Sequence, residues 1–203
     1  MFDRLSRGLA ITGIFLIAGA ALAAAFGYKA GSQSWTDASG KAGASYRDVL
    51  TTADYFGLES IKGWEYNHRL CVLEIEQEAF ATRDLSRLDT LKICEPTVGQ
   101  VWKRADIGSG EFLTGIAVCT GANKDDPSVH GFKLTGATLE ADGKLKSGKA
   151  PVKAEFDDCK KWLPERTCPK GSVATGVRAY FDDDEHGLVG LGLRCHALEP
   201  RGK

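Results

Sequence analysis

The sequence lacks any marked excess of charge of one sign. Its 203 residues include 26 lysines and arginines against 27 aspartates and glutamates, which gives a formal net charge of −1. No basic cluster is large enough to form the positive surface that nucleic acids require. The composition therefore predicts no nucleic-acid partner.

Several catalytic and metal-binding motifs are also missing. There is no Gly-x-Ser-x-Gly motif, and no Ser, His and Asp set can be assembled from spacing alone. No Cys-x-x-Cys pair occurs, and the 4 histidines show no ligand spacing, which argues against zinc. The absence of an Asp-x-Asp-x-Asp-Gly run weakens the case for calcium. We therefore predict a non-catalytic protein without a cofactor, with Ca²⁺ as the alternative.

Charged residues are also missing from the N-terminal stretch Gly8 to Tyr28, which follows Arg4 and Arg7. The stretch becomes rich in small side chains toward its end, as a signal peptidase site requires. Residues 1–25 are therefore predicted to be a signal peptide, although the stretch is also long enough for an uncleaved membrane anchor. In both cases the rest of the chain is exported, to a secreted or periplasmic location. It contacts the membrane only if the segment stays uncleaved.

All 6 cysteines lie beyond this leader, and an even number in an exported chain predicts disulfides. Two of the expected pairs would each close one strand–loop–strand unit, and the third joins the remaining two cysteines. A competing pair, Cys159 with Cys168, would instead close the short loop 160–167. The expected pairs are Cys71–Cys94, Cys119–Cys159 and Cys168–Cys195.

Glycine accounts for 24 residues, which lie at turns and strand ends and favour an all-β protein. From Cys71 onward, apolar and polar side chains alternate as they do in a strand. Residues 26–44 are predicted to form a flexible approach to the folded domain, because Gly, Ser and Ala are frequent there. We therefore expect a single disulfide-stabilised domain over 45–203. The spacing of apolar residues over 45–56 indicates a short helix.

One segment occurs twice in the C-terminal half of the sequence. The first copy begins at Thr114-Gly115 and the second at Thr175-Gly176, and each continues through an acidic loop into a second apolar strand. Such repetition predicts a fold built by internal symmetry. Whether the segment between Cys71 and Cys94 is a third unit stays open, because that segment lacks the Thr-Gly pair and the acidic pair.

The second copy resembles a repeat unit of the vitelline membrane outer layer protein I family. The likeness is carried by Cys168-Pro169-Lys170-Gly171, Thr175-Gly176-Val177, the acidic loop and Gly190-Leu191-Gly192-Leu193-Arg194-Cys195. It implies a β-prism, with three antiparallel sheets about a pseudo-threefold axis, as in jacalin-type lectins; the alternative is a β-trefoil or a β-sandwich. The resemblance also implies an extracellular, non-catalytic protein with a carbohydrate-binding surface.

The acidic loops are the candidate ligand-binding segments. Their carboxylates could accept hydrogen bonds from sugar hydroxyls or bind calcium, but aspartate is also favoured in turns for its side-chain-to-backbone bonds. A tryptophan beside two lysines could serve as a platform for a sugar or could cap the core. The predicted ligand-binding residues are Asp125, Asp126, Asp182, Asp183, Asp184 and Trp162.

These observations predict an exported binding or envelope-associated structural module, with a glycan or a cell-envelope component as its partner. The alternative is a protein-interaction or protease-inhibitor module that presents the loop 160–167. A hydrolase is the third reading, because Glu74, Glu76 and Glu78 alternate on one strand face like paired carboxylates. Three like charges in line are more typical of a solvated surface.

Overall fold

The computed structural model describes residues 26–66, 69–94, 101–123, 126–182 and 187–201. Every regular element in these ranges is a β-strand, which confirms the all-β prediction. No helix in the described part of the chain is long and apolar enough to cross a membrane. The predicted leader, residues 1–25, lies outside the described residues.

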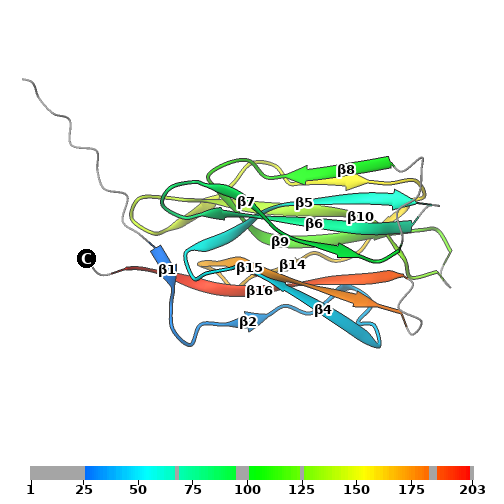
Figure 1. The fold of residues 1–203 in the computed structure, drawn as a ribbon, viewed down its shortest axis with the longest axis horizontal. Helices are drawn as coiled ribbons and strands as arrows, with labels where there is room; N and C mark the ends of the chain where they lie inside the picture. Colours follow the sequence, from blue (N-terminus) through cyan, green and yellow to red (C-terminus); the bar gives the residue numbers. More distant parts are fainter. Residues whose placement is uncertain (1–25, 67–68, 95–100, 124–125, 183–186, 202–203) are drawn as a thin grey trace, which may run out of the picture.

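The strands form three antiparallel sheets whose long hairpins run side by side (Figure 1). The first sheet has four strands in the order β7-β6-β5-β8. Its strands are β5 (Phe56–Tyr66), β6 (Arg69–Ala79), β7 (Leu85–Lys92) and β8 (Val101–Asp106). In β6 the side chains of Leu73 and Ile75 face the core, as the alternating pattern predicted.

The second sheet has the order β11-β10-β9-β13, with β12 also paired to β10 and β14 to β9. Its strands are β9 (Glu111–Thr120), β10 (Val129–Leu139), β11 (Leu145–Ser147), β12 (Val152–Glu155), β13 (Lys161–Trp162) and β14 (Arg166–Thr167). The central β9–β10 hairpin is the first copy of the sequence repeat. The short strands β13 and β14 attach the segment 160–167 to the edge of β9.

The third sheet is built from both ends of the chain. Its strands are β1 (Phe26–Tyr28), β2 (Ser34–Trp35), β3 (Ser39–Gly40), β4 (Ser45–Leu50), β15 (Ser172–Phe181) and β16 (Leu188–Pro200). Because β1, β2 and β3 all pair with β16, residues 26–40 are part of the folded domain. The flexible approach expected over 26–44 is therefore replaced by three short strands.

The predicted short helix at 45–56 is wrong. The structure has strand β4 at this position, paired along its length with β15. The helical spacing was misleading because these apolar residues do not share one buried face: Val49 is 3% exposed, whereas Tyr46 and Leu50 are 56% and 40% exposed. Tyr46 instead packs against the guanidinium of Arg178, 4.0 Å from its ring centroid.

Side chains from all three sheets meet in one apolar core. Each long hairpin contributes fully buried residues, among them Ile61 and Ile75, Ile116 and Phe132, and Val177 and Leu193. A smaller aromatic cluster, which includes Phe26, Phe80 and Phe112, packs separately from this core. Three sheets around a shared core are the arrangement that the β-prism prediction requires.

Each long hairpin carries a β-bulge at a corresponding position. In the second and third sheets the unpaired residues are Thr114 and Thr175. Their hydroxyls donate to the backbone oxygens of Thr135 (3.1 Å) and Arg194 (3.4 Å) on the partner strand. In the first sheet the same irregularity falls at Glu59. The Thr-Gly pair of the sequence repeat therefore marks a bulge. A third unit exists with glutamate in place of threonine, but it is the β5–β6 hairpin and not the segment between Cys71 and Cys94.

Three disulfides are formed, and they are the pairs expected from the sequence. Cys119–Cys159 and Cys168–Cys195 each have an S–S distance of 2.01 Å, so the competing Cys159–Cys168 pair is not formed. Three disulfides indicate an oxidising, extracellular environment.

Candidate functional site

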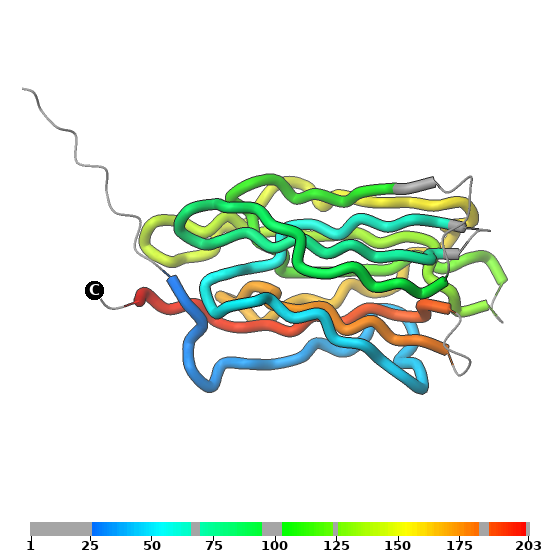
Figure 2. Tube along the Cα trace, in the orientation of Figure 1, coloured from blue at the N-terminus to red at the C-terminus, as the bar shows by residue number. Residues whose placement is uncertain are grey.

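One cleft brings together segments that the sequence analysis considered separately. Its lining includes residues at the end of β9 and just before β10, and Figure 2 shows that these strand ends lie at one end of the molecule. Its volume is about 740 Å³. The described lining consists of Gly40 and Lys41, the hairpin residues Thr120 to Asn123 with Asp126 and Pro127, and Lys160, Lys161 and Leu163. The cleft therefore includes part of one acidic loop and part of the loop 160–167.

Backbone and hydroxyl contacts hold the cleft walls together. Ser39, which is 1% exposed, donates from its hydroxyl to the backbone oxygen of Pro164 at 3.0 Å. The same hydroxyl accepts the backbone N–H of Val118 at 3.0 Å, which ties the N-terminal segment to β9. On the opposite wall, the N–H of Lys160 donates to the backbone oxygen of Thr120 at 3.0 Å. These bonds fix three distant segments in one arrangement.

Gly40 lines the cleft and has no adequate substitute. Its φ of +101° lies in the region that side-chain-bearing residues rarely adopt. A Cβ atom there would lie 2.4 Å from the backbone oxygen of Val189, so the glycine lets this strand approach β16 closely. The N–H of Lys41 then donates to the same Val189 oxygen at 2.9 Å, which places Lys41 at the rim.

Asp126 is the predicted acidic residue that lines the cleft. Its carboxylate Oδ1 accepts the backbone N–H of Ser128 at 3.0 Å, and its own N–H donates to the backbone oxygen of Asn123 at 3.3 Å. Asp126 therefore both shapes the turn and lines the cleft. Its neighbour in the repeat, Asp125, lies outside the described residues.

Asp182 occupies the equivalent place in the β15–β16 hairpin but does not line the cleft. Its Oδ1 accepts the backbone N–H of Gly187 at 3.2 Å, so it also closes its own turn. A Cβ on Gly187 would lie 3.6 Å from the hydroxyl of Ser128, which shows that the two hairpin ends are adjacent. Asp183 and Asp184 lie outside the described residues.

Trp162 lies on the same short segment as two cleft residues but points elsewhere. It pairs with Cys119 in the sheet, and its ring is half-buried with the Lys153 ammonium 5.1 Å from the centroid. Because successive side chains alternate along a strand, Lys161 and Leu163 line the cleft and Trp162 does not. The loop 160–167 reaches the cleft through these other side chains.

Sequence reasoning missed Lys41 and Asn123. Lys41 falls in the segment interpreted as a flexible approach, and Asn123 belongs to no motif. Their place in the cleft depends on the pairing of β3 with β16 and on the course of the β9–β10 turn. Neither this strand pairing nor the course of the turn can be predicted from the local sequence.

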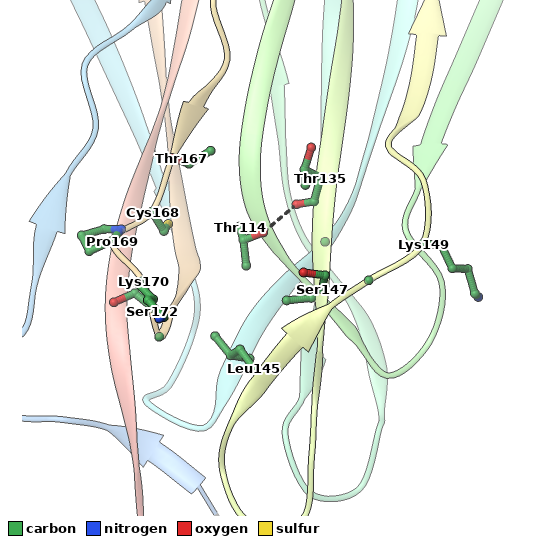
Figure 3. A pocket seen from close by; sticks show the side chains of 14 residues that line it. Thr114, Thr135, Leu145, Ser147, Lys149, Thr167, Cys168, Pro169, Lys170 and Ser172 are labelled. Atoms are coloured by element: carbon green, nitrogen blue, oxygen red, sulfur yellow. Dashed lines mark hydrogen bonds between the residues drawn. The ribbon is translucent and has the colours of Figure 1, made fainter.

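A smaller groove of about 250 Å³ lies beside the bulge of the second sheet. Figure 3 shows Thr114 and Thr135 on one side of it and the Thr167–Ser172 segment on the other. Lys149 is drawn pointing away from this space. The Thr135 hydroxyl is buried and has no hydrogen-bond partner among the described residues. The groove contains none of the predicted ligand-binding residues.

The first sheet carries a network of paired charges on the face of β6 opposite the core. Glu76 is 7% exposed and accepts hydrogen bonds from Ser60 (2.5 Å), Lys62 (2.5 Å) and Arg104 (2.9 Å). Burial alone would raise the pKa of Glu76, but these bonds and charges outweigh it and hold the pKa below its ordinary value. Glu78 is 1% exposed, so the expected solvated row at 74, 76 and 78 is wrong.

Glu59, the bulge residue of the first sheet, belongs to this network. It is 2% exposed, and its burial, followed by its hydrogen bond to Asp106, raises its pKa to about 8. The hydrogen bond from Glu59 is the main cause that lowers the pKa of Asp106, which also accepts from Arg104 at 2.7 Å. Because the pKa of Glu59 is raised and that of Asp106 is lowered, Glu59 holds the proton of this pair and donates to an ionised Asp106. These carboxyls stabilise the sheet and border neither of the two cavities described above.

No family model and no curated protein matches the sequence. Solved structures do match the fold. A structure of Calsepa lectin in complex with a biantennary N-glycan superposes with a TM-score of 0.55 at 13% identity, covering 81% of this chain and 97% of the lectin. The Calystegia sepium agglutinin gives 0.53 at 13% identity, over 81% and 96%.

At this level of identity the likeness establishes the architecture alone. The chain has the jacalin-like β-prism fold expected from the sequence. Membership of the vitelline membrane outer layer protein I family stays a prediction, because no family model matches.

Proposed function

We propose that this protein is a non-catalytic carbohydrate-binding module that holds a glycan in the hairpin-end cleft. The observation that carries the proposal is the composition of the cleft: hydroxyl, amide, carboxylate and ammonium groups on firmly held walls. The similar Calsepa lectin was solved with an N-glycan bound, which supports carbohydrate as the ligand class. The glycan would come from an extracellular surface or the cell envelope.

The cleft residues suit the chemistry of sugar recognition. Asp126 can accept hydrogen bonds from pyranose hydroxyls, while Asn123 can both donate and accept. The described acidic residues of the two hairpins already bond to their own turns, so we expect binding to persist in EDTA.

The test is a glycan array probed with the wild type, Asp126→Asn and a matched control. Asn keeps the oxygen that accepts the Ser128 N–H but removes the charge, so the turn should survive. Asp142→Asn is the control, because Asp142 accepts the N–H of Lys144 at the same 3.0 Å distance in an exposed turn away from the cleft.

We expect the wild type and the control to bind the same glycans. Asp126→Asn should bind about tenfold more weakly, since a hydrogen bond to a charged group contributes about 1.5 kcal/mol or more. Recovered glycans should be chemically unchanged. A wild type that binds no glycan, or an Asp126→Asn variant that binds as well as the wild type, would contradict the proposal.

The protease-inhibitor alternative has less support. An inhibitory loop needs to be presented to the protease, whereas β13 and β14 attach both ends of the segment 160–167 to β9. The Leu163 N–H also donates to the Val118 oxygen at 2.9 Å. The pairing of Cys168 with Cys195 agrees with closure of the repeat and not with a small cysteine-closed loop.

A further inference from the structure

Three lysines lie along the cleft, and they come from two separate parts of the chain. Lys41 follows β3, whereas Lys160 precedes β13 and Lys161 is its first residue. Asp126 is the carboxylate among the described lining residues. The described lining therefore has a surplus of positive charge in a protein whose overall net charge is −1.

These lysines differ from those on the sheet faces in their ion pairing. Lys62 pairs with Glu74 at 3.0 Å, and Lys133 pairs with Glu165 at 3.1 Å. In the cleft, Lys160 has only a 4.0 Å contact with Asp158. Lys41 and Lys161 are exposed and form no ion pair with any residue in the described ranges. Their ammonium groups are available to an anion from outside.

The backbone beneath these ammonium groups is fixed. Lys41 is held by its N–H bond to Val189 and by the close packing of Gly40. Lys161 pairs with Thr120 in the sheet and lies two residues after the disulfide-bonded Cys159. An ammonium group on a fixed backbone is a compact point charge that suits a carboxylate oxygen.

We infer that the glycan is acidic, a saccharide that carries carboxylates such as a uronate polymer. This inference rests on the proposed function and names its substrate class. Lys41 and Lys161 bind the sugar carboxylates, while Asn123 and Asp126 contact the hydroxyls. Neutral sugars of the same backbone bind more weakly because they leave both ammonium groups without a partner.

The experiment compares a trigalacturonate with its carboxyl-reduced counterpart, titrated into the full protein by calorimetry at low and at physiological salt. The variants are Lys41→Gln/Lys161→Gln and a control of equal net charge, Lys29→Gln/Lys146→Gln. The control lysines are exposed and lie outside the cleft. Circular dichroism melts confirm that each variant is folded.

We expect the wild type and the control to prefer the acidic trimer, and the preference to weaken as salt is added. The Lys41→Gln/Lys161→Gln variant should lose about tenfold in affinity for it, the sum of two exposed charge contacts. Equal binding of both trimers by the wild type would overturn the acidic-glycan inference and leave the proposed function intact. Failure to bind these trimers and every glycan on the array would overturn both.

Discussion

Two regions of this prism contain groups of charged side chains, and the two groups differ in burial and in ion pairing. In the first sheet, Glu76 is buried and accepts three hydrogen bonds, and Glu59 donates a hydrogen bond to Asp106. In the hairpin-end cleft, Lys41 and Lys161 are exposed and have no ion-pair partner in the described part of the chain.

Buried, paired charges stabilise the fold, whereas exposed, unpaired charges can bind a ligand. A buried carboxylate needs a charged or hydrogen-bonding partner, since an unpaired one would cost several kcal/mol. An exposed ammonium on a fixed backbone has no such requirement and can receive an outside anion. The alternating glutamates that suggested a hydrolase belong to the charges that stabilise the fold.

The largest expected effect comes from breaking the first-sheet network. Glu76→Ala leaves Arg104, Lys62 and Ser60 without their shared acceptor. We therefore expect the free energy of unfolding to fall by about 2–3 kcal/mol. Urea denaturation measures the change. The control is Glu155→Ala, whose partner Lys153 is half-exposed and which should cost about 0.5 kcal/mol or less. Equal losses for both variants would show that the network has no special role.

The next effect is on the pH dependence of stability. The folded pKa of Glu59 is raised to about 8 from an ordinary value of 4.5, so the folded state keeps a proton that the unfolded chain has lost. This contribution is fully present below pH 4.5 and is lost as the pH rises toward 8. Glu59→Gln cannot ionise, so its unfolding free energy should change less across that window. A wild-type unfolding free energy that fell no more than that of Glu59→Gln between pH 5 and pH 8 would refute this assignment.

A smaller effect is expected at the uncharged bulge of the third sheet. The Thr175 hydroxyl is fully buried and lies 2.7 Å from Nδ1 of His196, which stacks on Tyr28. Thr175→Val keeps the shape but leaves the imidazole nitrogen unsatisfied, at a cost of about 1–2 kcal/mol. Thr114→Val, at a less buried site, should cost about half as much. Chemical denaturation of the pair tests whether burial sets the difference.

The smallest effect on stability is expected in the cleft. Lys41→Gln/Lys161→Gln should change the unfolding free energy by less than about 0.5 kcal/mol, as is usual for exposed substitutions. The same variant is expected to lose ligand affinity. If it instead unfolded as easily as Glu76→Ala, the lysines would be structural and the contrast between the two regions would fail.

The sequence was sufficient for the features that repeat or that are chemically distinctive. Glycine placement and strand alternation predicted the all-β class, and the doubled Thr-Gly segment predicted internal symmetry. The third unit was left open and was sought between Cys71 and Cys94, because Glu59 occupies the bulge of the β5–β6 hairpin where a threonine was expected. The same backbone irregularity accepts either a threonine hydroxyl or a carboxyl. Similar geometry does not require similar residues.

The cleft could be predicted only in part. Asp126 and the loop 160–167 were identified because acidic turns and basic loops stand out in sequence. Lys41 was missed because its position depends on β3 pairing with β16, which is some 150 residues away along the chain. Tyr46 and Leu50 produced a false helix because apolar residues were assumed to face the core.

The most direct measurement is an amide chemical-shift map of the protein titrated with an oligosaccharide that the array identifies. Glycan binding in the cleft predicts shifts that saturate at Gly121, Asn123 and Lys161, with little change at Thr135 in the smaller groove. Shifts centred on Thr135, or none at saturating ligand, would contradict the assignment of the cleft as the binding site.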